Sequence, residues 1–344
     1  MKHLEISSVL GKCTVLIGTS IEKWISKQNW EKHIFITDEN LHGLYRDFFT
    51  ETPTIVIGLG ENIKNLNTIE YIYHRLLELE ADRTTVVTGF GGGIVCDITG
   101  YAASTYMRGL QFNLIPTSLL AQVDASIGGK NGVNLLEYKN IIGTFSQPQY
   151  VLLDFDLLKT LPQREITAGV AEIVKHALIA SPDLFSYIEK NSSGLLSLEP
   201  GVVETAVLES IRIKSEVVES DAKEGGERRK LNFGHTFGHA LEKIYGLSHG
   251  EAVSLGMVIA ARISKSRDLL TEKDENRILS LLNQLKLPTN ISLQKPELID
   301  TTRRDKKREG ECVHFVLLSG IGKTEIVKLS YKRLEEHIHD LCES

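Results

Sequence analysis

Three histidines lie in one stretch of the chain that reads LNFGHTFGHALEKIYGLSHGE: His235, His239 and His249. With Arg228 and Asn232, the first two are spaced at i, i+4, i+7 and i+11, which predicts one polar stripe of an α-helix. Burying such a stripe without hydrogen-bonding partners costs free energy. We therefore favour a functional site here, and a solvent-exposed helix face with scattered histidines is the alternative. Gly234 and Gly238 would lie inside this helix, where each glycine destabilises the helix by about 1 kcal/mol relative to Ala. Because the chain keeps both glycines despite this cost, we expect another part of the protein or a ligand to approach the helix backbone closely there.

These residue types are typical of a metal site. Neutral imidazoles and a carboxylate are common ligands of a catalytic Zn²⁺, which keeps a fourth position open. Glu172, on a separate predicted helix over residues 164–180, shares a face with Lys175 and His176. No HExxH motif is present, which disfavours a zincin protease. Spacing alone leaves open whether His235 and His239 both bind metal, or one of them acts on substrate.

A glycine-rich turn indicates a second kind of site. Residues 88–97 read TGFGGGIVCD, between a predicted strand over 84–88 and a helix from 94 to about 107. The amides of such a turn can hold a pyrophosphate at the helix N-terminus. Against the dinucleotide fingerprint, Gly91, Gly93 and Cys96 occupy the three glycine positions, so the match alone is weak. A tight strand-to-helix turn without a ligand is the alternative.

The elements that must position these residues change in type along the chain. Predicted strands over 15–18, 33–37, 54–58, 84–88, 112–115 and 151–154 alternate with helices such as 66–79. This alternation predicts a largely parallel sheet with helices on both faces and ligands at the carboxyl ends of strands. From about residue 161, helices dominate: 164–180, 200–221 and the nearly all-apolar 251–267, followed by a hairpin of 313–318 with 324–329. We therefore expect an α/β N-terminal Rossmann-like nucleotide-binding domain over 1–160. A mainly α-helical C-terminal metal-binding domain is expected over 161–344.

Other polar residues fall in predicted loops. Residues 116–134 and 138–143 supply Asp124, Lys130, Lys139 and Asn140, and such loop residues more often carry function than packing. The segments KEGGERRK (223–230) and RRDKKR (303–308) are also charged, and solvated loops are the alternative for both.

Composition excludes several classes of protein. The 344 residues are 42% hydrophobic and 24% charged, with a net charge of −6, so no nucleic acid or membrane partner is expected. The four cysteines are scattered without CxxC spacing, as in a cytosolic protein with reduced thiols. We expect neither a signal peptide nor a membrane span, since the long apolar runs that both require are missing from the sequence.

Eight motifs together resemble the 3-dehydroquinate synthase family, within the sugar-phosphate cyclase superfamily. They read GENIKNLNT, GGGIVCDITGYAASTYMRG, IPTSLLAQVDASIGGKNGVN, YKNIIGTF, LPQREITAGVAEIVKH, IKSEVVESDAKEGGERRKLNFGHTFGHALE, HGEAVSLGM and RDKK. They cover about residues 35 to 320. One position departs from the family pattern GGGxxGD, because Cys96 replaces its last glycine.

The resemblance implies a role for each matching residue. Glu172, His235 and His249 would bind Zn²⁺ or Co²⁺, which leaves His239 for catalysis. The substrate would be bound by Asp124, Lys130, Asn140, Lys175, Lys214, Arg228, Asn232 and one of Lys306 or Lys307. NAD would be bound by Asp38, Asn40, Glu61, Lys64, Gly92, Gly93, Ile94, Val95, Cys96, Asp97, Thr117, Ser118, Lys130, Lys139, Leu157, Leu158, Lys159 and Thr160.

The resemblance also implies the reaction. The family converts 3-deoxy-D-arabino-heptulosonate 7-phosphate, a sugar acid phosphate, to 3-dehydroquinate and phosphate through a transient oxidation by NAD. A homodimer is expected, with Arg108 near the partner's site. Three alternatives remain: another sugar-phosphate cyclase, a metal-dependent polyol dehydrogenase that would release NADH, and a non-catalytic regulator. The set of Lys and Arg residues suits an anionic substrate and disfavours the last two.

Overall fold

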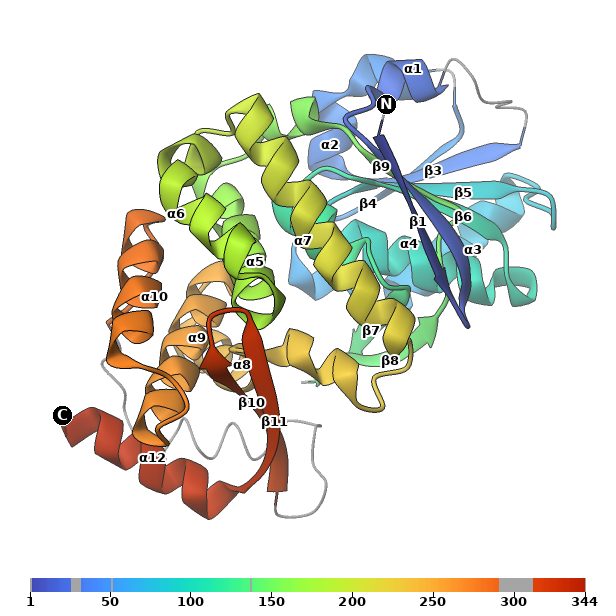
Figure 1. Cartoon of the computed structure of the whole chain (residues 1–344). Coiled ribbons are helices and arrows are strands. Elements are labelled where there is room, and N and C mark those ends of the chain that lie inside the picture. The colour runs from blue at the N-terminus through green and yellow to red at the C-terminus, as the bar shows by residue number, and fades with distance from the viewer. Residues whose placement is uncertain (1, 26–31, 51, 137, 291–311, 344) are drawn as a thin grey trace. The chain divides into compact units, whose positions relative to one another are not determined.

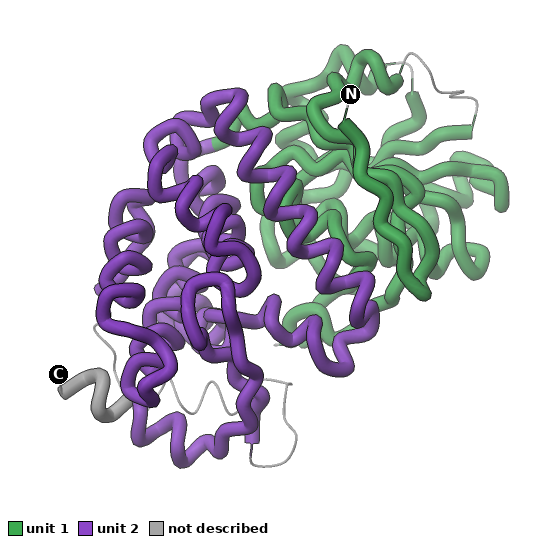
Figure 2. The backbone as a smooth tube through the Cα atoms, viewed as in Figure 1, with its two compact units in different colours: residues 1–161 green, residues 162–344 purple. Residues whose placement is uncertain are grey.

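The structure is a computed structural model that describes residues 2–25, 32–50, 52–136, 138–290 and 312–343 (Figure 1). The chain divides into two compact units, unit 1 (Met1–Leu161) and unit 2 (Pro162–Ser344) (Figure 2). Lys306 and Lys307 lie outside the described residues. No helix among the described residues is long and apolar enough to cross a membrane.

Unit 1 is built on a sheet that, within the described residues, has seven strands in the order β1-β2-β9-β6-β5-β3-β4. In chain order these are β1 (Lys2–Ser8), β2 (Gly11–Ile17), β3 (His33–Asp38), β4 (Thr54–Ile57), β5 (Val86–Gly91), β6 (Gln111–Pro116) and β9 (Tyr150–Leu153). β1 runs antiparallel to β2 and the other neighbours run parallel. The six predicted strands are confirmed with small shifts at their ends, and β1 was not predicted.

Helices cover both faces of this sheet. Trp24 of α1 (Ile21–Ile25) and Leu41 of α2 (Glu39–Leu44) pack with Phe35, Phe90 and Ile115 of the strands. α3 (Leu66–Glu78) and α4 (Gly93–Thr105) lie on the opposite face (Figure 1). α3 buries Ile69, Ile72 and Leu76, which recur at helical spacing. The expectation of a Rossmann-like α/β unit is confirmed.

The segments predicted as loops after β6 are instead ordered elements. A π-helical turn, η4 (Ala121–Ala125), is followed by a hairpin of β7 (Lys130–Leu135) and β8 (Tyr138–Phe145). The prediction was wrong because the hairpin is polar and glycine-rich, so no apolar alternation marks its strands. Buried Asn131 instead donates to the carbonyls of Gly129 and Ser146 at 3.1 and 3.0 Å.

Unit 2 is mainly helical, as predicted. Its helices are α5 (Gln163–Ala180), α6 (Pro182–Leu196), α7 (Pro200–Ser220), α8 (His235–Tyr245), α9 (His249–Ser266), α10 (Glu272–Gln284) and α12 (Tyr331–Glu343). The predicted hairpin is present as β10 (Cys312–Gly320) and β11 (Lys323–Ser330). The apolar helix α9 is buried over most of its length and begins with a capping box of Ser248 and Glu251. It therefore forms the core of this unit, as its sequence predicted.

The continuous helix predicted from Arg228 through His239 is wrong. A short 3-10 helix, η6 (Glu227–Asn232), ends before Gly234, whose φ of +77° is left-handed, and α8 begins at His235. This φ favours glycine, and the chain turns here between the two helices. Arg228 and His239 therefore do not lie on one helical stripe.

The close approach predicted at the two glycines is confirmed, and the approaching partner is α9. A Cβ on Gly234 would meet the carbonyl oxygen of Val253 at 3.0 Å, and one on Gly238 would meet that of Ala252 at 3.2 Å. A Cβ on Gly256 of α9 would lie 1.8 Å from the carbonyl oxygen of Gly234. The glycines thus allow two helix backbones to pack closely, and the two helices carry His235 and His249.

Candidate active site

Glu172 lies at the centre of the candidate site of unit 2, next to two histidines. Its side chain is fully buried on α5, and its Oε1 lies 2.9 Å from Nε2 of His249 and 3.4 Å from Nε2 of His235. The ligand atoms of these three residues all lie within 4.8 Å of one another. Two nitrogens and one oxygen at such separations fit the donor set of a single Zn²⁺ with an open coordination position.

The orientation of His235 also fits a metal ligand. Its Nδ1 lies 3.1 Å from the carbonyl oxygen of Phe233, which can only accept, so Nδ1 donates and Nε2 keeps a lone pair directed toward Glu172. A backbone carbonyl behind an imidazole is the usual way a protein fixes the orientation of a ligating histidine. Burial, with the charge of Lys175, lowers the pKa of His235 to about 4, so this ring is neutral at pH 7.

Lys175 makes the buried carboxylate of Glu172 anionic. Burial alone would raise the pKa of Glu172, but the Lys175 ammonium beside its Oε2, together with the two histidines, holds this pKa well below its ordinary value. Lys175 is itself only 1% exposed. One turn of α5 therefore presents an anionic ligand atom and a cation side by side.

The other predicted residues that the structure describes in unit 2 lie on three elements. His239 follows His235 by one turn of α8, with ring centroids 5.4 Å apart, and is half-buried. Lys214 is buried on α7. Arg228 is 2% exposed and donates from Nη1 to the carbonyl of Ala222 at 2.5 Å. The buried position of Arg228 does not fit the solvated-loop alternative for its segment.

Sequence reasoning missed three polar residues around these groups, namely Asp221, Glu224 and Ser210. The amide of Asn232 donates to Oε1 of Glu224 at 2.6 Å, and the Asp221 carboxylate accepts N–H groups from the same turn. Nδ1 of buried His176 lies 2.7 Å from Oγ of Ser210, which joins α5 to α7. Glu224 and Asp221 lie in a charged turn whose pattern also fits a solvated loop, so no sequence signal distinguished them.

Several predicted NAD residues of unit 1 lie at the carboxyl ends of its parallel strands. Asp38 ends β3, Gly91 ends β5 and Thr117 follows β6, and the strand register places these ends on neighbouring strands. Asp38 also caps α2, accepting from the N–H of Leu41 at 2.9 Å, and its pKa is raised by burial. Asn40 lies in the first turn of the same helix. Ligands of open α/β sheets bind at this edge.

The glycine turn is open where a pyrophosphate would lie. A Cβ on Gly92 would meet nothing closer than Oγ of Ser118, at 3.8 Å, whereas one on Gly91 would overlap the Val95 side chain at 2.5 Å. Gly93, Ile94 and Val95 form the first turn of α4, whose N–H groups have no partners within the helix. The turn therefore fits the phosphates of a dinucleotide.

Cys96 lies behind this turn. Its side chain is 1% exposed, and its Sγ lies 3.7 Å from the carbonyl oxygen of Gly91, so it packs between helix and strand. Burial, and then the charge of Asp97, raise the pKa of its thiol. The small side chain is thus accommodated within the protein at the position of the missing glycine.

Two polar contacts flank the turn. Lys64 forms an ion pair with Asp97, whose pKa is raised by burial against the opposing effect of Lys64. The amide of Asn134 donates to Oε1 of Glu61 at 2.8 Å, which connects the Glu61 segment to β7.

Other predicted NAD residues are placed less directly. Leu157 and Leu158 have side chains buried in the core, so only their backbone groups could contact NAD. Lys159 forms an ion pair with Asp156 at the surface. Thr160 donates to the carbonyl of Leu157 at 3.3 Å.

The hairpin residues are more exposed. Lys130, Lys139 and Asn140 lie on β7 and β8, and Asp124 is half-buried in η4. Asn140 has a φ of +52° and its N–H donates to Oδ1 of Asn134 at 2.8 Å. Arg108, predicted to reach a partner subunit, is exposed, with a φ of +72°.

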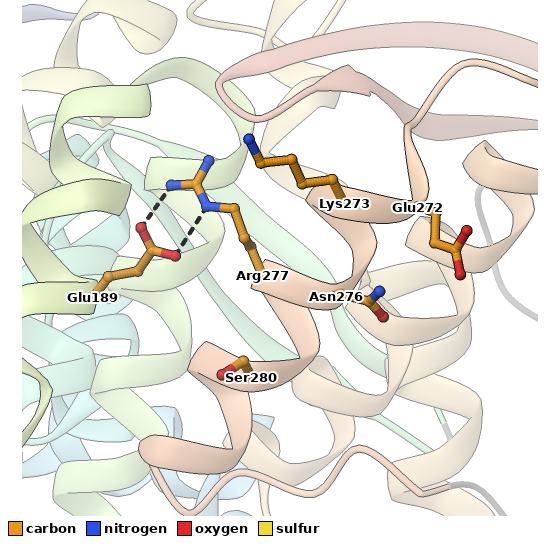
Figure 3. Close-up of a pocket in the computed structure, with 6 residues that line it drawn as sticks. All are labelled: Glu189, Glu272, Lys273, Asn276, Arg277 and Ser280. Atoms are coloured by element: carbon orange, nitrogen blue, oxygen red, sulfur yellow. Dashed lines mark hydrogen bonds and ion pairs between the residues drawn. The ribbon is translucent and has the colours of Figure 1, made fainter.

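Unit 2 also has a depression with a different lining (Figure 3). It has a volume of about 600 Å³ and is lined by Glu189, Glu272, Lys273, Asn276, Arg277 and Ser280. Arg277 donates to both carboxylate oxygens of Glu189, at 3.1 and 2.6 Å (Figure 3). Its guanidinium is thus already neutralised, and none of the predicted site residues that the structure describes lines this depression.

Solved structures share the fold of the whole chain. A 2-deoxy-scyllo-inosose synthase complexed with carbaglucose-6-phosphate, NAD⁺ and Co²⁺ is 27% identical, with a TM-score of 0.88 over 98% of this chain and 100% of that one. The 2-epi-5-epi-valiolone synthase from Streptomyces hygroscopicus with NAD⁺ and Zn²⁺ is also 27% identical, with a TM-score of 0.86 over 96% of each chain. A probable glycerol dehydrogenase from Sinorhizobium meliloti, at 14% identity and a TM-score of 0.67 over 99% and 98% of the two chains, shares the fold alone.

Sequence comparison identifies the family. Residues 54–168 match the model of the 3-dehydroquinate synthase N-terminal domain, and residues 169–308 match that of the C-terminal domain. The 3-dehydroquinate synthase of Alkaliphilus metalliredigens is 40% identical over 90% of each chain, and that of Nitrosomonas europaea is 42% identical over 83% of this chain and 78% of its own. With its metal-type cluster and glycine turn in place, the chain belongs to the 3-dehydroquinate synthase family.

Proposed function

We propose that this protein is a 3-dehydroquinate synthase, a lyase that converts 3-deoxy-D-arabino-heptulosonate 7-phosphate to 3-dehydroquinate and phosphate. The observation that carries the proposal is the cluster of Glu172, His235 and His249 with Lys175 beside it, in a chain 40% identical to named synthases. A metal-type donor set next to a buried cation suits an anionic sugar substrate.

Two bound groups would complete the site. NAD would be held at the carboxyl edge of the unit 1 sheet by the residues named above, and Zn²⁺ or Co²⁺ by Glu172, His235 and His249. When bound, NAD⁺ supplies the acceptor for a transient oxidation of a substrate alcohol, and the metal supplies a Lewis acid.

The protein's own residues bind and orient the substrate. Lys175, Lys214 and Arg228 supply positive charge for its phosphate and carboxylate, and Asn232 supplies an amide hydrogen bond. Asp124, Lys130 and Asn140 of unit 1 complete this proposed set. His239, one turn beyond His235, exchanges protons with substrate, because an imidazole there need not bind the metal.

The proposal is tested by measuring phosphate release and NADH accumulation in the same reaction. A synthase should release phosphate from 3-deoxy-D-arabino-heptulosonate 7-phosphate in proportion to substrate consumed, with catalytic NAD⁺ and no net NADH. Accumulation of NADH equal to the substrate consumed would instead identify a polyol dehydrogenase. Phosphate release from other sugar phosphates, with none from this substrate, would identify another cyclase of the superfamily.

We also propose a cytoplasmic homodimer. Three of the cysteines, Cys13, Cys96 and Cys312, are free thiols, which suits a reducing compartment. In the dimer, Arg108 would approach the partner's site, and its exposed position suits that role. Sedimentation of the purified protein tests the dimer.

A further inference from the structure

The turn that follows α7 is organised by one carboxylate. Asp221 accepts the N–H of Gly225 at 2.8 Å through Oδ1, and those of Gly226 and Arg228 at 2.7 and 3.0 Å through Oδ2. We call this arrangement the Asp221 clasp. These three N–H groups stabilise the negative charge of the Asp221 carboxylate.

The Asp221 clasp holds Arg228, the residue of this turn that is proposed to bind the substrate. The backbone N–H of Arg228 bonds to Asp221, and its guanidinium donates to the carbonyl of Ala222 at 2.5 Å. Both ends of Arg228 are therefore held by two adjacent residues, and its side chain is 2% exposed. Burial acts to raise the pKa of Asp221, but the three N–H bonds and the charge of Arg228 lower it overall, so this carboxylate stays ionised.

We propose that Asp221 is a positioning residue for the reaction, and that its clasp holds Arg228 in the orientation that binds an anionic group of the substrate. The inference rests on the proposed function. A free arginine side chain loses rotamer entropy when it is fixed. A turn that orders the arginine before the substrate arrives removes much of that cost from binding.

Kinetics of matched variants test this role. Asp221→Ala should raise KM for the sugar acid phosphate by roughly ten- to a hundredfold, with a much smaller change in kcat and unchanged metal content. Asp221→Asn should recover part of the loss, since its amide oxygen still accepts. Glu216→Ala removes the same charge from an exposed position on α7 and should behave like the unaltered protein. A drop in kcat with unchanged KM in the Asp221 variants would overturn the proposal.

A double-mutant cycle separates positioning from general damage. If the clasp acts through Arg228, Asp221→Ala should add nothing to KM in an Arg228→Ala background. Additive effects of the two substitutions would overturn the proposal.

Two measurements do not depend on turnover. Hydrogen exchange at Gly225, Gly226 and Arg228 should quicken in Asp221→Ala while α9 stays protected, and calorimetry should show weaker binding of inorganic phosphate. Unchanged exchange and phosphate affinity would overturn the clasp and leave the proposed function standing. If the unaltered protein released no phosphate from substrate, the proposed function would fail, while these two measurements would still decide the clasp.

Discussion

At the scale of single residues, Glu172 is held by three side chains at once. Its carboxylate is fully buried, lies between two imidazoles and pairs with Lys175. Removing one partner of such a cluster leaves buried charge uncompensated, so function and stability are both expected to depend on it.

The first prediction concerns the metal ligands. His235→Ala and His249→Ala should each lose the bound metal, because each removes one of three proposed ligands. His239→Ala should retain it yet lose turnover by roughly 10²–10⁴-fold, as expected for a removed acid–base group. Elemental analysis and phosphate-release rates check both parts. Full metal retention by both ligand variants would refute the assignment.

The second prediction concerns the cysteines. Burial raises the pKa of Cys13 to about 12, and Cys96 is buried with a raised pKa as well. Since the thiolate is the reactive form, neither should be alkylated by iodoacetamide at pH 8 in the folded protein. Mass spectrometry of peptides from native and denatured samples checks this, with labelling in the denatured sample as the control. Rapid native labelling of Cys96 would contradict its buried packing.

At the scale of elements, the contact between α8 and α9 brings His235 and His249 together. These histidines begin their helices, and close packing at Gly234, Gly238 and Gly256 brings the helix backbones near each other. The glycines therefore serve the site indirectly, through helix packing.

The third prediction tests that packing. Gly256→Ala should lower the free energy of unfolding by about 1–3 kcal/mol or more, because its Cβ would overlap the carbonyl of Gly234. It should also weaken metal binding by displacing one ligand helix. Gly201→Ala is the control, since Gly201 lies at the start of α7 with nothing within 4 Å, and it should gain about 0.4–1 kcal/mol. Denaturant unfolding checks both, and equal stability of the two variants would contradict the packing argument.

At the scale of the whole molecule, the proposed reaction draws on both units. The predicted NAD residues belong to unit 1, and the predicted metal ligands and most substrate cations belong to unit 2. The net charge of −6 makes these cations local features of an acidic protein, as an anionic substrate requires.

The fourth prediction concerns stability against pH. Burial lowers the pKa of His33, at the start of β3, below its ordinary value of 6.5. The folded state therefore holds this ring neutral while the unfolded state takes up a proton, so the free energy of unfolding falls as pH falls through about 6.5. His33→Gln should reduce this slope by at most about 1.4 kcal/mol per pH unit. Urea unfolding between pH 7.5 and 5.5 checks it, and parallel slopes would contradict it.

The sequence by itself determined most of the element types and the family. Short apolar runs predicted the parallel strands, and a nearly all-apolar segment predicted α9, because elements that are buried on every side are apolar throughout. The eight motifs identified the family, and the polar residues of α5 and of the histidine stretch indicated a metal.

Only the tertiary structure decided which atoms meet. The spacing of the polar residues placed Arg228 through His239 on one helix. In the structure the left-handed φ of Gly234 separates η6 from α8. Residue spacing alone does not encode such an interruption of a helix. The choice of Glu172 as the shared partner of His235 and His249 depends on α5, α8 and α9 packing together, and the Asp221 clasp depends on a turn closing on itself. These contacts join residues distant in the chain or held by irregular backbone, so they follow from packing and not from periodicity.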